Sequence, residues 1–174
     1  MRSALREATG MVHERLHQAE PFAALARREL GRSAYLELLS TFSAFHVTVS
    51  QSLGLDEERR IRLARDLEYL GGREQAPVAW SPPDSAAGRL GSAYVVEGSS
   101  LGGKIIYRQL DYLLGSNPDG RRFFQGTASD GERWRGLCQR IEALGRDDAA
   151  RDEMIAGASN TFALFEKLIE PVNA

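Results

Sequence analysis

Residues 92–107 read Ser-Ala-Tyr-Val-Val-Glu-Gly-Ser-Ser-Leu-Gly-Gly-Lys-Ile-Ile-Tyr, and they depart most clearly from an ordinary helix. Apolar residues flank the glycines Gly98, Gly102 and Gly103, so we predict one helix that continues through them. Each glycine inside a helix costs about 0.5–1 kcal/mol relative to alanine. Gly98 and Gly102 are four residues apart and therefore share a face. The stretch predicts a helix that can kink and that exposes bare backbone on one side.

Two kinds of structure need such a bare face. Small residues let two helices pack with their backbones close together, which is a purely structural use of the glycines. A flat ligand that lies against the backbone also needs glycines, because side chains would collide with it. Local sequence rules fail most often at functional sites, which favours the second interpretation without excluding the first.

The rest of the chain shows helical periods and almost no strand signals. The predicted helices span about residues 3–17, 33–53, 56–70, 84–114, 130–144 and 147–169, with loops over 73–83 and 115–120. We place N-terminal caps at Ser3, Ser33 and Asp84, and C-terminal stops at Gly54 and Gly71. Helices of this number and length predict an all-α fold, with residues 1–174 forming a single domain.

The composition excludes several classes of protein. With 174 residues, 43% hydrophobic, 26% charged and a net charge of −2, the chain is typical of a globular domain without a basic nucleic-acid-binding face. No apolar window of about 20 residues predicts a membrane span, and the N-terminus lacks the apolar core of a secretion signal. The single cysteine, Cys138, fits the core of a protein from a reducing compartment. We expect a soluble, cytoplasmic protein, with a monomer favoured.

The segment Ala4–His17 carries a second unusual pattern. His13 stands beside Val12 at the edge of the predicted buried stripe, and Arg6 is two turns earlier on the same face. A histidine in this position is usually a hydrogen-bonded boundary residue. Alternatively, a cation and an imidazole so aligned suit a ligand that has both a metal centre and carboxylates, and haem is such a ligand. His17 completes an i, i+4 pair but lacks a third metal ligand nearby.

These segments resemble a known family. Residues 4–13, Ala-Leu-Arg-Glu-Ala-Thr-Gly-Met-Val-His, are similar to the proximal-helix motif of the haem oxygenases. Residues 94–103, Tyr-Val-Val-Glu-Gly-Ser-Ser-Leu-Gly-Gly, are similar to their glycine-rich distal helix in the bacterial branch. The order and separation of the motifs extend the resemblance over essentially the whole chain. It implies a haem oxygenase-like helical fold in which haem is sandwiched between a proximal and a kinked distal helix.

The resemblance also implies roles for individual residues. His13 would be the proximal iron ligand, and Gly98 and Gly102 would let the distal backbone lie over the porphyrin. Further haem contacts would come from cations and aromatic residues, namely Arg6, Tyr94, Arg135 beside Trp134, and Phe162. Gly10 stands where some members carry a second cation, so propionate binding would depend more on Arg6.

The implied activity is oxidative cleavage of haem b to biliverdin, CO and ferrous iron, with haem as both cofactor and substrate. It would use O2 and an electron donor, either a ferredoxin- or flavodoxin-type reductase system or ascorbate. The residues expected at the reacting face are Gly98, Ser99 and Gly102. Ser99 stands where many members have an aspartate, so we expect protons to arrive through water, with Ser99 or Ser100 assisting.

Two other functions remain open from the residues. A haem carrier or sensor of the same fold would need the same binding residues. A helical relative with another ligand, such as a thiaminase-like or di-metal protein, is a further alternative. The di-metal version is less favoured, because a di-metal site needs two Glu-x-x-His pairs and only Glu14–His17 has that spacing. For His46 we predict a buried hydrogen bond between helices. We interpret Arg59–Arg62 as a solvated face that could dock an acidic electron donor.

Overall fold

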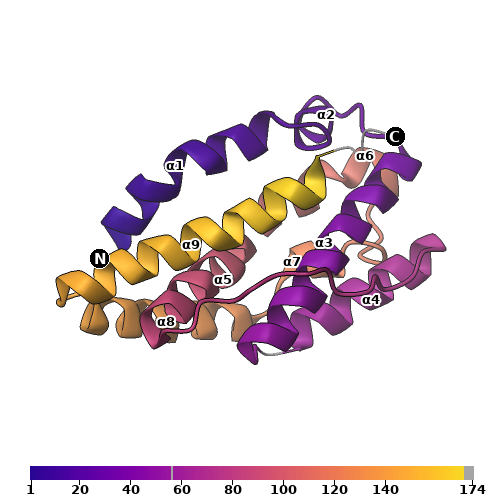
Figure 1. Ribbon diagram of the computed structural model, residues 1–174. Helices are drawn as coiled ribbons and strands as arrows, with labels where there is room; N and C mark the ends of the chain where they lie inside the picture. The colour runs from indigo at the N-terminus through magenta and orange to yellow at the C-terminus, as the bar shows by residue number, and fades with distance from the viewer. Residues whose placement is uncertain (56, 171–174) are drawn as a thin grey trace.

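The structure is a computed structural model that describes residues 1–55 and 57–170, and within these ranges it is helical without a strand (Figure 1). Its helices in chain order are α1 (Arg2–Gln18), α2 (Phe22–Ala26), α3 (Arg32–Leu53), α4 (Glu58–Leu70), α5 (Ala86–Gln109), α6 (Asp111–Leu114), α7 (Arg122–Gln125), α8 (Ala128–Leu144) and α9 (Asp148–Ile169). The all-α prediction is therefore confirmed. None of the helices in the described part of the chain has an apolar stretch long enough to cross a bilayer.

Helix α9 packs against both α5 and α1 and joins them (Figure 1). Two glycines let α5 and α9 approach closely. A Cβ atom on Gly91 would lie 1.9 Å from the carbonyl oxygen of Met154, and one on Gly157 would lie 2.0 Å from the carbonyl oxygen of Gly88. The buried Ser92 hydroxyl also donates to the Gly157 carbonyl at 3.2 Å. Close backbone packing thus occurs on α5 about two turns before Gly98, in addition to the packing within the glycine run described below.

The larger of two apolar clusters fills the space between α3, α4, α7 and α9. Aromatic rings meet there with centroid separations of 5.0–5.4 Å, and the rings are those of Phe42, Phe45, Phe123, Phe124 and Phe165. The smaller cluster lies between α1, α5, α8 and α9 and includes Leu5, Leu137, Ile141 and Met154. Cys138 is buried beside it, as predicted. These clusters hold α1, α5, α8 and α9 in the arrangement that forms the site described below.

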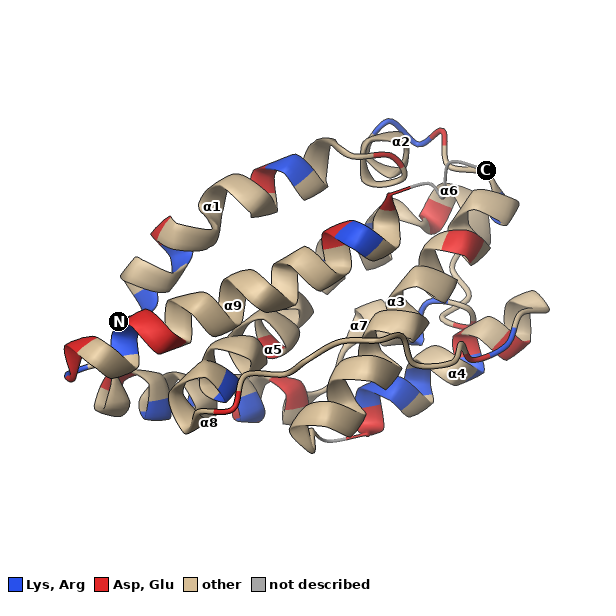
Figure 2. Ribbon diagram, viewed as in Figure 1, with Lys and Arg blue, Asp and Glu red and all other residues tan. Residues whose placement is uncertain are grey.

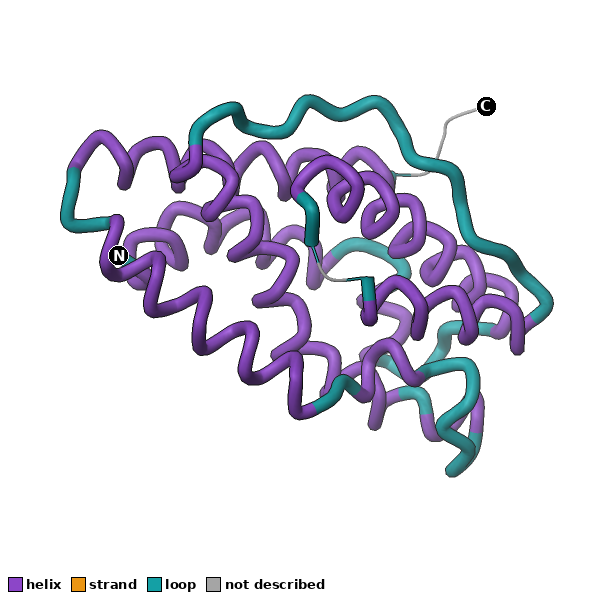
Figure 3. Tube along the Cα trace, turned by 90° about the horizontal axis from the view of Figure 1, so that it is seen from below, coloured by secondary structure: helices purple, strands orange, loops and turns teal. Residues whose placement is uncertain are grey.

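Two of the predicted helix ends are confirmed. Gly54 ends α3 and Gly71 ends α4, both with the positive φ angles, 66° and 87°, that favour glycine. The predicted loop over 73–83 is also present, and it runs along α3 as the long connection in Figure 3. Hydroxyls of α3 accept two of its backbone N–H groups: Ser43 from Gln75 at 3.0 Å, and Thr48 from Val78 at 2.9 Å.

The predicted N-terminal caps are wrong. Helix α1 begins at Arg2, so Ser3 lies inside it, and α3 is capped by Gly31 rather than Ser33. The cap of α5 is Ser85, whose hydroxyl accepts the Gly88 N–H at 3.0 Å, instead of Asp84. The segment predicted over 84–114 divides into α5 and α6, and α8 begins two residues before the predicted 130. Asp56, the predicted start of the third helix, lies outside the described residues.

Candidate functional site

The side chain predicted to bind iron lies exposed on α1. The His13 ring is 4.6 Å from the His17 ring and 6.5 Å from the Phe162 ring of α9, measured between centroids. Partial loss of hydration lowers the pKa of His13, and the neighbouring His17 and Arg6 lower it further. The neutral imidazole is therefore favoured near pH 7, and this is the form that binds a metal.

Aromatic side chains from three helices lie on the same side of the molecule. Tyr94 of α5 and Trp134 of α8 are half-buried with their ring centroids 5.5 Å apart, and Phe162 is half-buried on α9. Arg6 is close enough to act electrostatically on both His13 and Tyr94, lowering the pKa of each, although burial raises the pKa of Tyr94 overall. The structure thus brings Arg6, His13, Tyr94 and Phe162 together, as the sequence predicted.

The glycines of α5 have three different environments. A Cβ on Gly103 would lie 3.0 Å from the Phe124 carbonyl oxygen, so this glycine serves the packing of α5 on α7. A Cβ on Gly98 would lie 3.3 Å from the Trp134 ring, whereas one on Gly102 would meet nothing within 4 Å. The packing explanation therefore holds at Gly103, whereas the ligand-binding explanation at Gly102 stays a prediction. Helix α5 is unbroken from Ala86 to Gln109, and a kink at the glycines stays a prediction.

An apolar strip on α5 surrounds Gly102. Leu101 and Ile105 are 56% and 61% exposed, large values for apolar side chains, and both share the helix face of Gly98 and Gly102. An exposed strip of this kind is typical of a surface that a ligand or partner covers. Together with the neutral His13, the Arg6 cation and the half-buried aromatic residues, it provides the nitrogen donor, positive charge and apolar surface that suit a haem.

Arg135 follows Trp134 on α8, and the hydrogen bond that it forms is to its own helix. Its side chain is exposed, and its Nε donates to the Gly131 carbonyl one turn back on α8 at 3.4 Å. In the described part of the chain no hydrogen bond or ion pair joins Arg135 to Arg6 or His13. Its role as a propionate cation stays a prediction.

The serines after Gly98 both bond back to their own helix. The Ser99 hydroxyl donates to the Val96 carbonyl at 2.7 Å, and the Ser100 hydroxyl donates to the Glu97 carbonyl at 2.6 Å. Ser99 also accepts a hydrogen bond of 3.0 Å from the guanidinium of Arg59 on α4. This contact links α4 to the predicted reacting face, and sequence reasoning missed it.

The interpretation of Arg59–Arg62 as a solvated face is wrong. Arg59 is only 5% exposed, and burial lowers its pKa to about 10. Figure 2 shows acidic and basic residues interleaved on α4 and α8. Five of these residues, together with Glu97 of α5, form what we call the α4–α8 charge cluster: Glu58, Arg59, Arg62, Asp130, Arg133 and Glu97. The sequence does contain a signal that these side chains are buried: the spacing of Arg59, Arg62 and Asp66 places them beside the apolar stripe of α4.

Within the cluster, Arg62 and Arg133 hold the carboxylates. Arg62 pairs with Asp130 at 2.9 Å and with Glu58 at 3.2 Å. Arg133 pairs with Asp130, with Glu58 at 3.1 Å and with Glu97 at 3.6 Å. Burial raises the pKa of Glu97, whereas hydrogen bonds and the nearby arginines hold the pKa of Asp130 below its usual value. The cluster therefore ties α4 to α8 through paired charges.

His46 is buried as predicted, but the predicted hydrogen bond between helices is absent from the described residues. Its Nε2 has no partner, and its ring packs against Phe45 and Phe123 with centroids 5.5 and 5.1 Å away. Burial, with Arg59 and Arg62 nearby, lowers the pKa of His46 well below its ordinary value. The aromatic packing of the neutral ring therefore comes with an unsatisfied buried nitrogen, which is an unfavourable contribution to stability.

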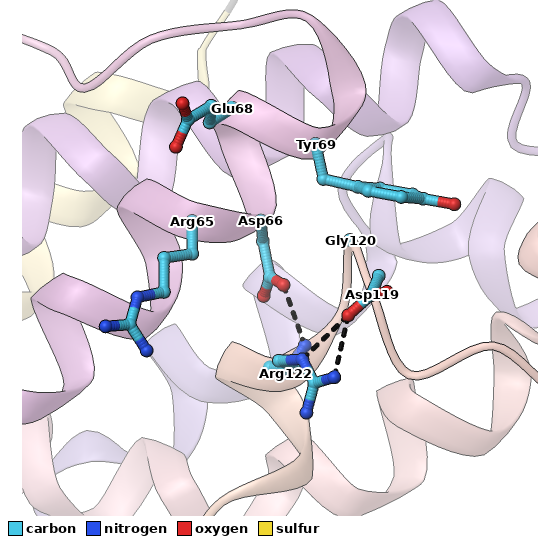
Figure 4. A pocket seen from close by; sticks show the side chains of 7 residues that line it. All are labelled: Arg65, Asp66, Glu68, Tyr69, Asp119, Gly120 and Arg122. Atoms are coloured by element: carbon cyan, nitrogen blue, oxygen red, sulfur yellow. Dashed lines mark hydrogen bonds and ion pairs between the residues drawn. The ribbon is translucent and has the colours of Figure 1, made fainter.

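A pocket of about 500 Å³ lies elsewhere, beside the end of α4 and the turn before α7 (Figure 4). It is lined by Arg65, Asp66, Glu68, Tyr69, Asp119, Gly120 and Arg122. Asp66 is buried and accepts the N–H groups of Arg122 and Phe123 at 3.0 and 2.7 Å. Burial outweighs these bonds and raises its pKa to about 6. None of the predicted site residues lines this pocket, and its carboxylate is used to hold α7.

Comparisons with known proteins agree on one family. The family model described as heme oxygenase matches residues 1–171. A curated heme oxygenase from Xanthomonas campestris pv. campestris (strain 8004) is 34% identical over 148 residues, which cover 84% of this chain and 87% of that protein.

Solved structures show the same fold. The NO- and CO-bound heme oxygenase from Neisseria meningitidis matches with a TM-score of 0.75 at 23% identity, covering 98% of this chain and 92% of that one. The heme oxygenase from Leptospira interrogans matches with a TM-score of 0.74 at 17% identity, covering 96% of this chain and 97% of that one. Given the family model that spans nearly its whole length and the Xanthomonas relative, the chain belongs to the heme oxygenase family.

Proposed function

We propose that this heme oxygenase binds haem b between α1 and the glycine-rich part of α5 and cleaves it to biliverdin, CO and ferrous iron. Haem is then both cofactor and substrate. The observation that carries the proposal is the pairing of a neutral, exposed His13 with a bare, apolar α5 face around Gly102. Membership of the family supports the same activity.

On the α1 side, His13 supplies the iron ligand. Its neutral imidazole has a nitrogen lone pair that would bind the iron, and the chain would then supply a single histidine ligand. Arg6, two turns earlier on α1, supplies positive charge for a propionate, and Tyr94 offers a hydroxyl at the same edge. Phe162, within ring-contact distance of His13, packs against the porphyrin and restricts its orientation.

On the α5 side, the backbone itself is the functional surface. The missing side chain at Gly102 would let main chain lie against the macrocycle, and Leu101 and Ile105 would keep bulk water away from it. Gly98, whose Cβ position faces the Trp134 ring, would let α5 and α8 pack closely beside that surface. When bound, haem supplies the iron that binds O2 and the ring carbon that is oxidised. The protein contributes orientation, exclusion of water and delivery of protons.

Proton delivery involves the serine hydroxyls after Gly98. Each hydroxyl donates to a carbonyl of its own helix, and its oxygen can still accept a hydrogen bond from water. Ordered water on Ser99 or Ser100 is therefore the proposed proton source. Electrons come from a ferredoxin- or flavodoxin-type reductase system or from ascorbate, and a reducing cytoplasm is the proposed location.

A single-turnover reaction tests the activity. Hemin-loaded protein is mixed with ascorbate and catalase in air, and absorption spectra are followed beside an anaerobic control. We expect the Soret band to disappear while a biliverdin band grows, and chromatography to identify the bilin. A stable oxy complex with an undiminished Soret band would instead indicate a haem carrier or sensor.

A further inference from the structure

Arg59 is a buried cation that contacts α5 on both sides of Gly98. Its Nη1 donates to the Val96 carbonyl at 2.5 Å, and its Nη2 donates to the Ser99 hydroxyl at 3.0 Å. The guanidinium also lies over the Phe123 ring, 5.2 Å from its centroid. A side chain of α4 therefore reaches through the interior to the turn of α5 that carries the first glycine of the bare face.

The charge of Arg59 has no direct counter-ion in the part of the chain that the structure describes. Arg62 and Arg133 make the close pairs with Asp130 and Glu97, which act on Arg59 only at longer range. The Nε of Arg59 also lacks a hydrogen-bond partner. Burying a guanidinium without an adjacent carboxylate is unfavourable, and such costs are concentrated at functional sites.

We propose that Arg59 is a positioning residue of the haem site: it fixes the Ser99 hydroxyl and places a positive charge behind Gly98 that stabilises anionic ligands on the iron. The inference rests on the proposed haem site and goes beyond it by assigning a role to a residue that does not touch haem.

The hydrogen bonds around Ser99 explain how the positioning works. The hydroxyl accepts from Arg59 and donates to Val96, so both its proton and one lone pair have defined directions. Ser99 is exposed, so the remaining lone pair of its oxygen is available to a water molecule. A positive charge a few ångströms further back favours anions, and in a partly buried site such a charge changes an ionic equilibrium by about tenfold.

Azide binding to the ferric, hemin-loaded protein tests the charge separately from turnover. We expect Arg59→Gln to weaken azide binding about tenfold, while Arg59→Lys keeps most of the affinity because it keeps the charge. Ser99→Ala retains the cation and should weaken azide binding less than Arg59→Gln. The matched control is Arg60→Gln on the next residue, whose partners Glu57 and Glu74 are on the surface, and its azide affinity should match that of the wild type.

The outcomes separate this inference from the proposed function. Wild-type azide affinity in Arg59→Gln, or azide affinities about tenfold weaker in both Arg59→Gln and Arg59→Lys, would show that Arg59 has only a structural role. Either result would overturn this inference and leave the proposed function standing. If Arg59→Gln does not fold, the other two variants decide. Wild-type azide affinity in Ser99→Ala, together with an azide affinity about tenfold weaker in Arg59→Lys, would also overturn the inference. A wild-type protein that binds no hemin would overturn both the proposed function and this inference.

Discussion

Replacing Gly102 with alanine separates the structural and the ligand-binding explanations of the glycine run. Gly102 lies inside α5, and a Cβ at this position would meet nothing within 4 Å. Alanine should therefore stabilise the apoprotein by about 0.8–1 kcal/mol through helix propensity alone. The same methyl group would stand between the backbone and a bound macrocycle, and crowding a packed contact costs about 1–3 kcal/mol. Hemin affinity should fall by about tenfold or more.

The assay pairs urea unfolding of the apoprotein with hemin titration of the same preparation. Gly136→Ala on α8 is the matched control, because Gly136 also has nothing within 4 Å of its Cβ position and faces away from Trp134. It should raise the free energy of unfolding by a similar amount and leave hemin affinity unchanged. A Gly102→Ala variant that binds hemin as tightly as the wild type would refute the contact between α5 and haem.

Three further predictions concern the scaffold. Gly91→Ala should destabilise the protein by more than about 3 kcal/mol or prevent folding, because the added Cβ would overlap the Met154 carbonyl. A thermal unfolding midpoint near that of the wild type would contradict this prediction. Arg121→Met should lower the free energy of unfolding in urea by about 3–5 kcal/mol, because the buried guanidinium donates hydrogen bonds to three carbonyls and one carboxylate. A decrease below about 1 kcal/mol would refute this prediction. Asp66, with its pKa raised to about 6, should make the folded state less stable by about 2–2.5 kcal/mol as pH rises from 4 to 7. Asp66→Asn should remove that part of the pH dependence, and an identical pH profile would exclude Asp66 as its source.

The sequence predicted helix ends better than helix starts, for a physical reason. A glycine stop depends on a local left-handed backbone, so Gly54 and Gly71 were readable from the sequence. The start of α1 depends on a distant contact instead. The N-terminal amine of Met1 pairs with Glu142 of α8 at 2.8 Å, and Arg2 pairs with the same carboxylate at 2.9 Å. A cap chosen by neighbouring residues alone could not include this interaction.

The residues of the candidate site were likewise predicted only in part. Arg6 and His13 lie close together because helix periodicity places them on one face of α1. Tyr94 and Phe162, which the family resemblance implied, lie close to them as well, and the roles of all four toward haem stay predictions. Arg59 was missed because charged residues that alternate in sign along a helix usually face solvent. A guanidinium at the end of a long side chain can bond to another helix far from its own backbone, and the period of its own helix does not indicate that partner.

The most direct test of the account is hemin titration of wild-type, His13→Ala and His17→Ala proteins, followed by absorption spectra of the ferric and ferrous–CO complexes. The account predicts stoichiometric, histidine-ligated haem in the wild type and in His17→Ala, whose ring lies beside that of His13. It predicts that His13→Ala loses the histidine-ligated spectrum. The same spectrum and stoichiometry in His13→Ala, or no stoichiometric complex with the wild type, would contradict the central claim that α1 supplies the iron ligand.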